Sequence, residues 1–279
     1  MSNWTTVISA ESKWYDFNLR ELVQYRDLIF MFVKRSFTAQ YKQTILGPLW
    51  FILNPLLTSF ISTVVFGGIA GIESEGVPYF LFYLCGYTLW NYFATCVNQT
   101  SVTFTANAGI LGKVYFPRLV MPISTVIYSA INMIVIFVMT VITMTVCAGR
   151  GVELHPNICI ILIPALVLQT AALSLGVGII VSSLTTKYRD LAVLVTFGVN
   201  LWMYATPVVY PLSRVSGKLR ICVLLNPMTA IITNFRYALL GVGSFETLWW
   251  GISILITLIV LVVGVLLFNK VEKTFMDTV

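Results

Sequence analysis

Between Arg118 and Arg150 the sequence reads LVMPISTVIYSAINMIVIFVMTVITMTVCAG, without one charged residue. A helix needs about 20 consecutive apolar residues to cross the roughly 30 Å of hydrocarbon in a bilayer. In that hydrocarbon each backbone N–H and C=O must find its hydrogen-bond partner within its own segment. The stretch therefore predicts a membrane-spanning α-helix at about 120–147.

Five more uncharged stretches lie on either side of this one. They predict further spanning helices at about 45–67, 78–98, 158–183, 191–210 and 248–268. The composition agrees, because 58% of the 279 residues are hydrophobic and 10% are charged, against about 45–50% and 25% in soluble domains. These figures argue against a soluble enzyme. The expected fold class is an all-α integral membrane protein with six transmembrane helices.

Lysine and arginine are divided unequally between the two sides of this arrangement. Twelve fall on the side of the N-terminus and five on the other side. Basic residues are enriched in cytoplasmic loops, so both termini are predicted to be cytoplasmic. The first outer loop agrees, because it carries Glu73 and Glu75 but no lysine or arginine.

The segment before the first span has a pattern of its own. Apolar residues recur at helical spacing and are interrupted by charges, which is typical of an amphipathic helix lying in the headgroup plane. Packing against another protein is the alternative. The apolar residues are Leu28, Ile29, Phe32, Val33 and Phe37. The predicted organisation is a cytoplasmic segment at 1–44, a six-span transmembrane domain at 45–270 and a cytoplasmic tail at 271–279.

Two connections are too long for simple turns. The stretch 98–117 is polar at its start and contains two glycines and a proline, and it predicts a short cytoplasmic helix. The stretch 211–246 contains two apolar pieces separated by Asn226 and Pro227. Neither piece is long enough to cross, so short re-entrant or interfacial outer helices are expected before the last span.

Several classes of chemistry lack the residues they need. His155 is the single histidine and the five cysteines form no CxxC pair, so no metal site is predicted. Ion-driven carriers place charges inside their spans, and the six predicted spans contain none. A phosphate-binding loop has the form GxxxxGK[ST], and the nearest match, NAGILGKV at 107–114, fails at two of its four defining positions. Any ATP used must therefore bind another polypeptide.

Because the predicted spans contain no charges, their candidate functional side chains are aromatic residues and amides. One interpretation is an aromatic belt at the headgroup level together with hydrogen bonds between helices. The other is a conduit in which sugar rings stack on aromatic rings while amides match their hydroxyl groups. The candidate path residues are Trp50, Trp90, Tyr92, Trp202 and Tyr204, with the amides Asn54, Asn91, Asn98, Gln169 and Asn200. Prolines in or beside the spans favour kinked helices around a cavity.

One run of residues resembles a known family. YKQTILGPLWFILNPL at 41–56 is similar to the entry to the first span in type-2 ABC exporter permeases that move bacterial surface polysaccharides. Weaker matches follow in the same order along the chain: KVYFPRLVMP at 113–122, YRD at 188–190, TPVVYP at 206–211 and Asn226-Pro227 before Arg236. The residues carrying the first match are Tyr41, Lys42, Gln43, Gly47, Trp50 and Pro55.

The resemblance implies a subunit of the bacterial inner membrane that pairs with a second copy of itself and with two copies of an ABC ATPase. ATP and Mg would bind the ATPase, with no cofactor on this chain and no nucleic-acid partner. Contact with the ATPase is implied for Asn107, Ala108, Gly109 and Ile110 and for Lys187, Arg189 and Asp190. The region 211–246 would form outer gate helices.

The implied cargo is a polysaccharide on a lipid carrier, moved out of the cytoplasm through the surrounding membrane lipid. Its phosphate group would lie near Arg20, Arg26, Lys34 and Arg35, although cytoplasmic topology explains those positions equally well. One alternative is a permease of the same architecture that exports a drug or a small lipid. Another is a membrane scaffold for polysaccharide synthesis that transports nothing.

Overall fold

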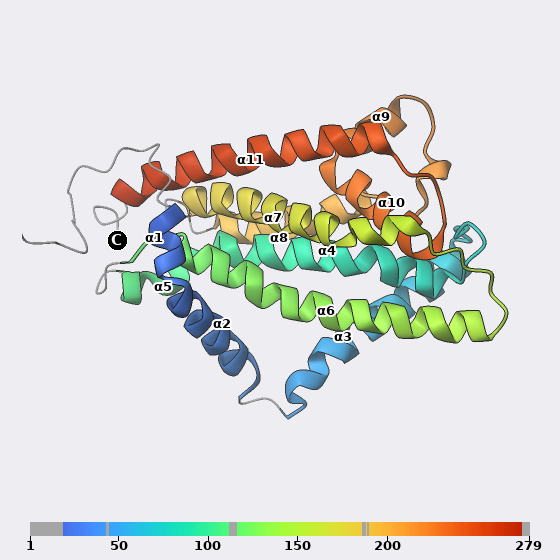
Figure 1. Ribbon diagram of the computed structural model, residues 1–279, viewed down its shortest axis with the longest axis horizontal. Coiled ribbons are helices and arrows are strands. Elements are labelled where there is room, and N and C mark those ends of the chain that lie inside the picture. The colour runs from blue at the N-terminus through green and yellow to red at the C-terminus, as the bar shows by residue number, and fades with distance from the viewer. Residues whose placement is uncertain (1–18, 43–44, 112–115, 186–187, 189, 275–279) are drawn as a thin grey trace, which may run out of the picture.

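The computed structural model describes residues 19–42, 45–111, 116–185, 188 and 190–274. Within these ranges every regular element is helical (Figure 1). Four helical stretches there are long and apolar enough to cross a membrane: Gly47–Ile69, Val120–Gly149, Ile158–Thr185 and Thr247–Lys270. The all-helical expectation is therefore confirmed.

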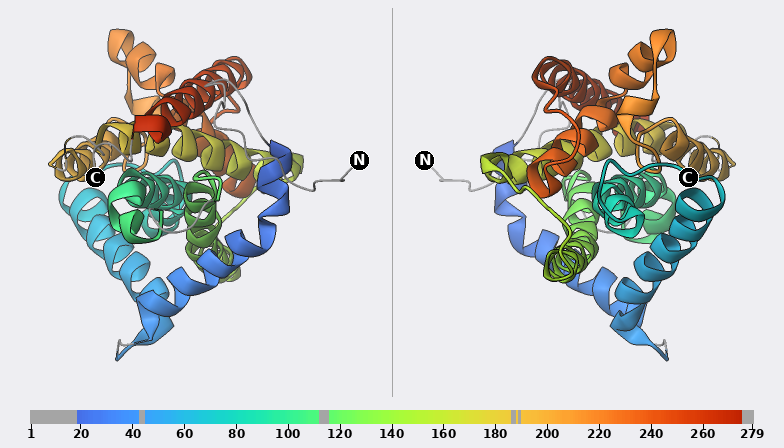
Figure 2. Two further views of the ribbon diagram at one scale, coloured as in Figure 1. Left: turned by 90° about the vertical axis from the view of Figure 1, so that its left-hand side faces the viewer. Right: turned by 90° about the vertical axis from the view of Figure 1, so that its right-hand side faces the viewer.

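The first half of the chain contains seven described elements. They are α1 (Leu19–Gln24), α2 (Arg26–Tyr41), the 3-10 turn η1 (Gly47–Leu49), α3 (Trp50–Ser62), the π-helical turn η2 (Thr63–Ile69), α4 (Tyr79–Ser101) and α5 (Thr103–Leu111). The short helix expected within 98–117 is thus present as α5. Viewed end on in Figure 2, α2 and α3 form a V that encloses α4 and α6.

The second half supplies the long helices of the bundle. It contains α6 (Val120–Gly149), η3 (Ile158–Leu162), α7 (Ile163–Thr185), α8 (Leu191–Tyr204), η4 (Leu212–Arg214), α9 (Gly217–Leu225), α10 (Pro227–Leu240) and α11 (Thr247–Thr274). In Figure 1, α4, α6, α7 and α11 run side by side along the long axis.

Helix α4 is the centre of the bundle. It packs against α6, α7, α8 and α10, and Phe82, Tyr83 and Phe93 on it are fully buried. Because protein surrounds it, α4 can carry amides and hydroxyls that a lipid-facing helix could not. This explains why α4 is long enough to cross but is not among the four most apolar helices.

Helices α7 and α11 approach each other closely at two glycines. An added Cβ at Gly176 would lie 2.9 Å from the Cα of Leu261, and one at Gly264 would lie 2.7 Å from the carbonyl oxygen of Gly176. Small residues at such crossings let helices approach closely in a membrane, where van der Waals packing supplies much of the association energy. These glycines therefore fix how near α11 lies to the core.

The apolar face of α2 packs inward. Ile29 and Phe32 are buried, and the Phe32 ring lies 5.8 Å from the ring of Phe116, while Phe30 and Met31 on other faces are exposed. The segment is helical, and Ile29 and Phe32 on its inner face are covered by the same chain. A location of α2 in the headgroup plane stays a prediction.

The fifth predicted span is shorter than expected. Helix α8 ends at Tyr204 and not near 210, because Pro207 and Pro211 have no N–H to continue the helical ladder. The chain after Tyr204 turns back toward the core, where Val208 and Val209 are buried.

The region 211–246 forms two short helices of different character. Helix α9 is largely exposed, with Leu219 and Ile221 more than half exposed. Helix α10 is mostly buried and begins where the side-chain oxygen of Asn226 accepts a 3.1 Å hydrogen bond from the N–H of Met228. The two apolar pieces expected around Asn226 and Pro227 are thus both helical, and only α10 enters the bundle.

Candidate functional site

A polar groove of about 400 Å³ lies where α3, α4 and α6 meet the end of α2. Each helix contributes one face, because residues three and four apart lie above one another. Helix α4 contributes Tyr87, Asn91, Thr95 and Gln99; α3 contributes Trp50, Phe51, Asn54, Pro55 and Thr58; α6 contributes Tyr128, Ser129 and Asn132; and α2 contributes Gln40. None of these lining residues is charged.

Hydrogen-bonding capacity in this groove exceeds what the protein itself uses. The Tyr87 hydroxyl donates to the Asn91 side-chain oxygen at 3.2 Å. The side-chain oxygen of Asn132 is buried and has no hydrogen-bond partner among the described residues. A buried acceptor without a partner costs about 1–3 kcal/mol, so a hydroxyl group from water or from a ligand would be favourable here.

Of the five aromatic residues predicted to form a path, the structure places Trp50 in the groove, where it is 40% exposed. Trp90 and Tyr92 are buried in the core. They lie on other faces of α4 than the groove residues that begin at Tyr87. Trp202 packs edge-on against Phe93, and Tyr204 is exposed. The groove therefore unites Trp50 with the amides Asn54 and Asn91 but not with the other four aromatic residues.

The family-like run at 41–56 builds the turn between α2 and α3. Tyr41 and Lys42 end α2, Gln43 lies outside the described residues, and Gly47 has the positive φ of +47° that opens the turn. Trp50 and Pro55 then lie on the groove side of α3. The run thus brings the end of α2 to the groove.

The predicted headgroup residues lie along α1 and α2. Arg20 is in α1, and its side chain is outside the described part of the chain. Arg26 forms an exposed contact of 3.8 Å with Asp27, and Lys34 and Arg35 are exposed on α2. Arg26, Lys34 and Arg35 point in different directions around α2, and none of the three lines the polar groove.

The predicted ATPase-contact residues on α5 lie at the end of the bundle that this helix marks in Figure 1. There Thr185, at the end of α7, donates a 2.5 Å hydrogen bond to the carbonyl of Ser101, at the end of α4. The Asn107 amide donates to the Thr103 carbonyl at 3.0 Å, and Asp190 is exposed just before α8. Gly109 and Ile110 belong to α5, as does Ala108, whose side chain is not described; Lys187 and Arg189 lie outside the described residues.

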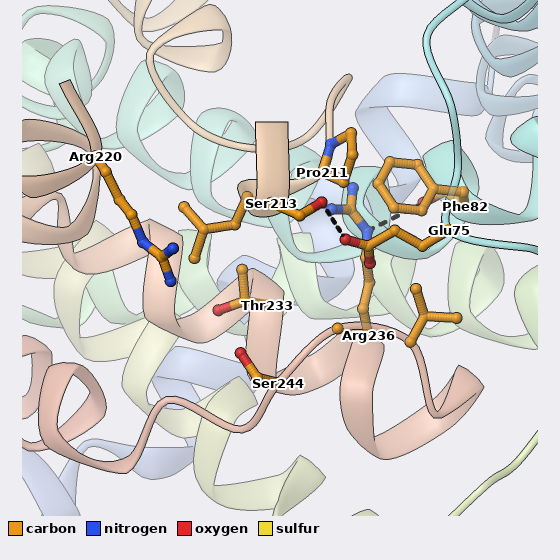
Figure 3. Close-up of a pocket in the computed structure, with 11 residues that line it drawn as sticks. Glu75, Phe82, Pro211, Ser213, Arg220, Thr233, Arg236 and Ser244 are labelled. Carbon is orange, nitrogen blue, oxygen red and sulfur yellow. Dashed lines mark hydrogen bonds between the residues drawn. The ribbon is translucent and has the colours of Figure 1, made fainter. Parts of the chain in front are cut away.

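A buried arginine at the opposite end is a feature that the sequence analysis missed. Arg236 on α10 is only 3% exposed, and its guanidinium lies 3.7 Å from the centre of the Phe82 ring. It donates to the carbonyl oxygen of Phe82 at 3.2 Å (Figure 3) and to those of Pro207 and Val208 at 2.6 Å each. Gly86 leaves the space for this guanidinium, since a Cβ there would collide with it.

The Tyr79 hydroxyl extends this arrangement. It donates to the Val209 carbonyl at 2.6 Å, so three successive carbonyls of the turn after α8 are held by side chains of α4 and α10. We call Arg236, Tyr79 and these three carbonyls the carbonyl clamp. A lone arginine in an otherwise uncharged segment was the only sign of this site in the sequence. Its three acceptors are backbone carbonyls, which every residue has, so the sequence could not identify them.

The apolar helices and the polar groove between them define an integral membrane protein. The chain belongs to the ABC-2 type transporter family, whose model matches residues 27–240. It is 31% identical to the O-antigen export system permease protein RfbA of Myxococcus xanthus over 220 residues, which are 78% of this chain and 82% of the relative. The Klebsiella pneumoniae protein of the same name is 27% identical over 90% of this chain and 94% of its own length.

A further relative is named for polysialic acid transport. The polysialic acid transport protein KpsM of Escherichia coli is 22% identical over 88% of this chain and 93% of its own length. The family resemblance stated from the sequence is therefore confirmed, and it extends over most of the chain.

Proposed function

We propose that this chain is the membrane-spanning subunit of an ATP-driven exporter that moves a lipid-linked cell-surface polysaccharide, of O-antigen or capsule type, out of the cytoplasm. The polar, uncharged groove beside Trp50 is the observation that carries the proposal, because amides and hydroxyls can exchange hydrogen bonds with sugar hydroxyls one after another. The names of the relatives support the same cargo.

The proposed assembly has six spans per subunit, with α4 and α8 added to the four most apolar helices. Two copies of this subunit would join two copies of an ABC ATPase in the bacterial inner membrane, with both termini cytoplasmic. Large apolar side chains exposed on α3 and α8, such as Phe60 and Phe197, suit contact with a second copy or with lipid. Residues 1–44 and 271–279 would flank the spans on the cytoplasmic side.

The energy would come from ATP and Mg bound by the ATPase. This chain lacks a complete phosphate-binding loop, and the groove lacks charged groups that could couple transport to an ion. ATPase closure would act on α5 and the neighbouring connection at 186–190. Hydrolysis would then bias two arrangements of the bundle and make transport directional.

A first test removes hydrogen-bonding groups from the groove. In cells lacking the chromosomal gene, Asn91→Leu and Asn132→Leu are each expected to lower surface polymer about tenfold, because the lost polar contacts are worth roughly 1–1.5 kcal/mol. Thr145→Val on the exposed face of α6 is the matched control and should export normally. Polymer is measured on intact cells with protein levels equalised. Full export by both leucine variants would contradict the groove as the path.

A second test addresses coupling. Gly109→Pro should break the last turn of α5 and reduce export roughly tenfold while the complex still hydrolyses ATP, because it removes the element through which closure is transmitted. Gly149→Ala at the far end of α6 is the control, since a Cβ there meets nothing within 4 Å. Export and phosphate release are measured on the same preparation. Parallel loss of both activities would contradict a coupling role.

A further inference from the structure

A second cavity lies at the end of the bundle that contains the carbonyl clamp. It has a volume of about 210 Å³ and is enclosed by the connection after α3, by η4, α9 and α10, and by the loop before α11 (Figure 3). Its polar lining consists of Glu75, Ser213, Arg220, Thr233, Arg236 and Ser244. Ligand pockets for drug-sized molecules are about 300–1,000 Å³, so this cavity suits a smaller ligand.

The lining offers donors and acceptors together. Arg236 uses three of its five N–H groups on the carbonyls of Phe82, Pro207 and Val208, and it forms no ion pair with a carboxylate in the described part of the chain. The Glu75 carboxylate accepts a 2.5 Å hydrogen bond from Ser213 and keeps further acceptor capacity. At the rim, Arg220 lies 3.6 Å from Glu246. A simple anion would be attracted by the arginines and repelled by Glu75.

The backbone of Glu75 adds an independent observation. Its φ is +56°, and it is the one non-glycine residue with a positive φ in the described ranges. This conformation costs a non-glycine residue about 1 kcal/mol. The next residue, Gly76, also has a positive φ, which glycine adopts without strain. The strained position beside it is occupied by Glu75, whose carboxylate faces the cavity. Such strain is typical of residues held for binding.

We propose that this cavity binds a single sugar unit of the exported glycan as it reaches the outer face. A sugar hydroxyl both donates and accepts, so neighbouring hydroxyls can satisfy Glu75 and Arg236 at once. The hydroxyls of Thr233 and Ser244 donate their protons to the Thr229 carbonyl and to Glu246, and their oxygens provide further acceptors. This inference rests on the proposed function, because it names a second contact for the same cargo beyond the groove.

The test uses the full-length protein in lipid nanodiscs prepared without glycoside detergents. Saturation-transfer NMR is recorded with glucose, galactose and N-acetylglucosamine at millimolar concentration, and with sulfate as the competing anion. The protein is expected to bind at least one of the three sugars, and sulfate should not displace it. Ser244→Trp should fill the cavity and weaken binding about tenfold, the equivalent of 1.4 kcal/mol. Ser216→Trp, on the same outer side but outside the lining, should bind as the unaltered protein does.

Glu75→Gly separates a binding role from a structural one. Glycine relieves the positive φ, so thermal stability should be maintained while sugar binding falls about tenfold. Loss of stability with unchanged binding would overturn the proposal, and so would displacement of the sugar by sulfate or absence of sugar binding. Surface export by the unaltered gene in the deletion strain is measured in parallel. Normal export without sugar binding would refute the sugar site in this cavity and leave the proposed function standing. Failure to restore export would refute the proposed function.

Discussion

Replacing Arg236 with methionine should remove most of the folded protein from the membrane. The variant leaves the carbonyls of Pro207 and Val208 buried without their donor. The Phe82 carbonyl also loses the guanidinium but keeps its partner within α4. Each unsatisfied buried group costs about 1–3 kcal/mol. The sum is comparable with the total stability of about 5–15 kcal/mol of a typical protein, so folding should be lost or severely weakened.

Three comparisons make this result specific. Arg236→Lys should be intermediate, because one ammonium group cannot reproduce the planar fork that reaches three acceptors. Gly86→Ala should also destabilise, since the added methyl group would displace the guanidinium. Arg220→Met is the control, because its partner contact with Glu246 lies at the solvent-exposed rim and exposed pairs contribute about 0–1 kcal/mol. Thermal unfolding and membrane yield are the measurements. Wild-type stability of Arg236→Met would show that the carbonyl clamp is dispensable.

The second large effect is expected where α7 meets α11. Gly176→Val and Gly264→Val each place side-chain atoms against the backbone of the facing helix. Overpacking usually costs about 1–3 kcal/mol, and the upper end is expected here because a backbone cannot rotate aside as a side chain can. The helices must therefore separate, which also loosens the contact between Trp250 and Gln169 that joins them by a 2.8 Å hydrogen bond.

Gly251→Val provides the matched control for these variants. It lies on the same helix as Gly264, but a Cβ there meets nothing within 4 Å. Its stability should therefore stay within about 1 kcal/mol of the unaltered protein, the cost of changing helix propensity alone. Unfolding is followed in the same nanodiscs for all three variants. Equal stability of Gly264→Val and Gly251→Val would show that the crossing tolerates separation.

Several elements could be predicted from local pattern. Uncharged apolar stretches predicted the bounds of four long helical stretches within about two residues, because length and apolarity are properties of one segment. These are Gly47–Ile69, Val120–Gly149, Ile158–Thr185 and Thr247–Lys270. The error at α8 came from treating Pro207 as compatible with a continuing span. Its unpaired carbonyl has a partner only because Arg236 on α10 reaches it.

The candidate path was predicted less well than the fold. The predicted path combined aromatic residues of the spans because they are aromatic. In the structure Trp50 lines the groove, whereas Trp90 and Tyr92 are buried in the core. Polar residues were scattered along the sequence, and only the packing of α3, α4 and α6 aligned Asn54, Asn91 and Asn132 on one groove. The rotation of each helix about its own axis depends on the helices packed against it. The sequence of a single segment does not specify that rotation.

The sequence alone determined that this protein is a helical membrane protein of the ABC-2 type transporter family and that its nearest match to a phosphate-binding loop is incomplete. Those conclusions depend on hydrophobicity, missing charges and short motifs, which are local. The tertiary structure alone decided that Arg236 belongs inside the bundle and that polar residues from three helices form one groove. Both depend on contacts between backbone carbonyls and helix faces that are far apart in the sequence. A polar group without a partner in a low-dielectric interior is costly, so burial makes each of these contacts necessary for stability.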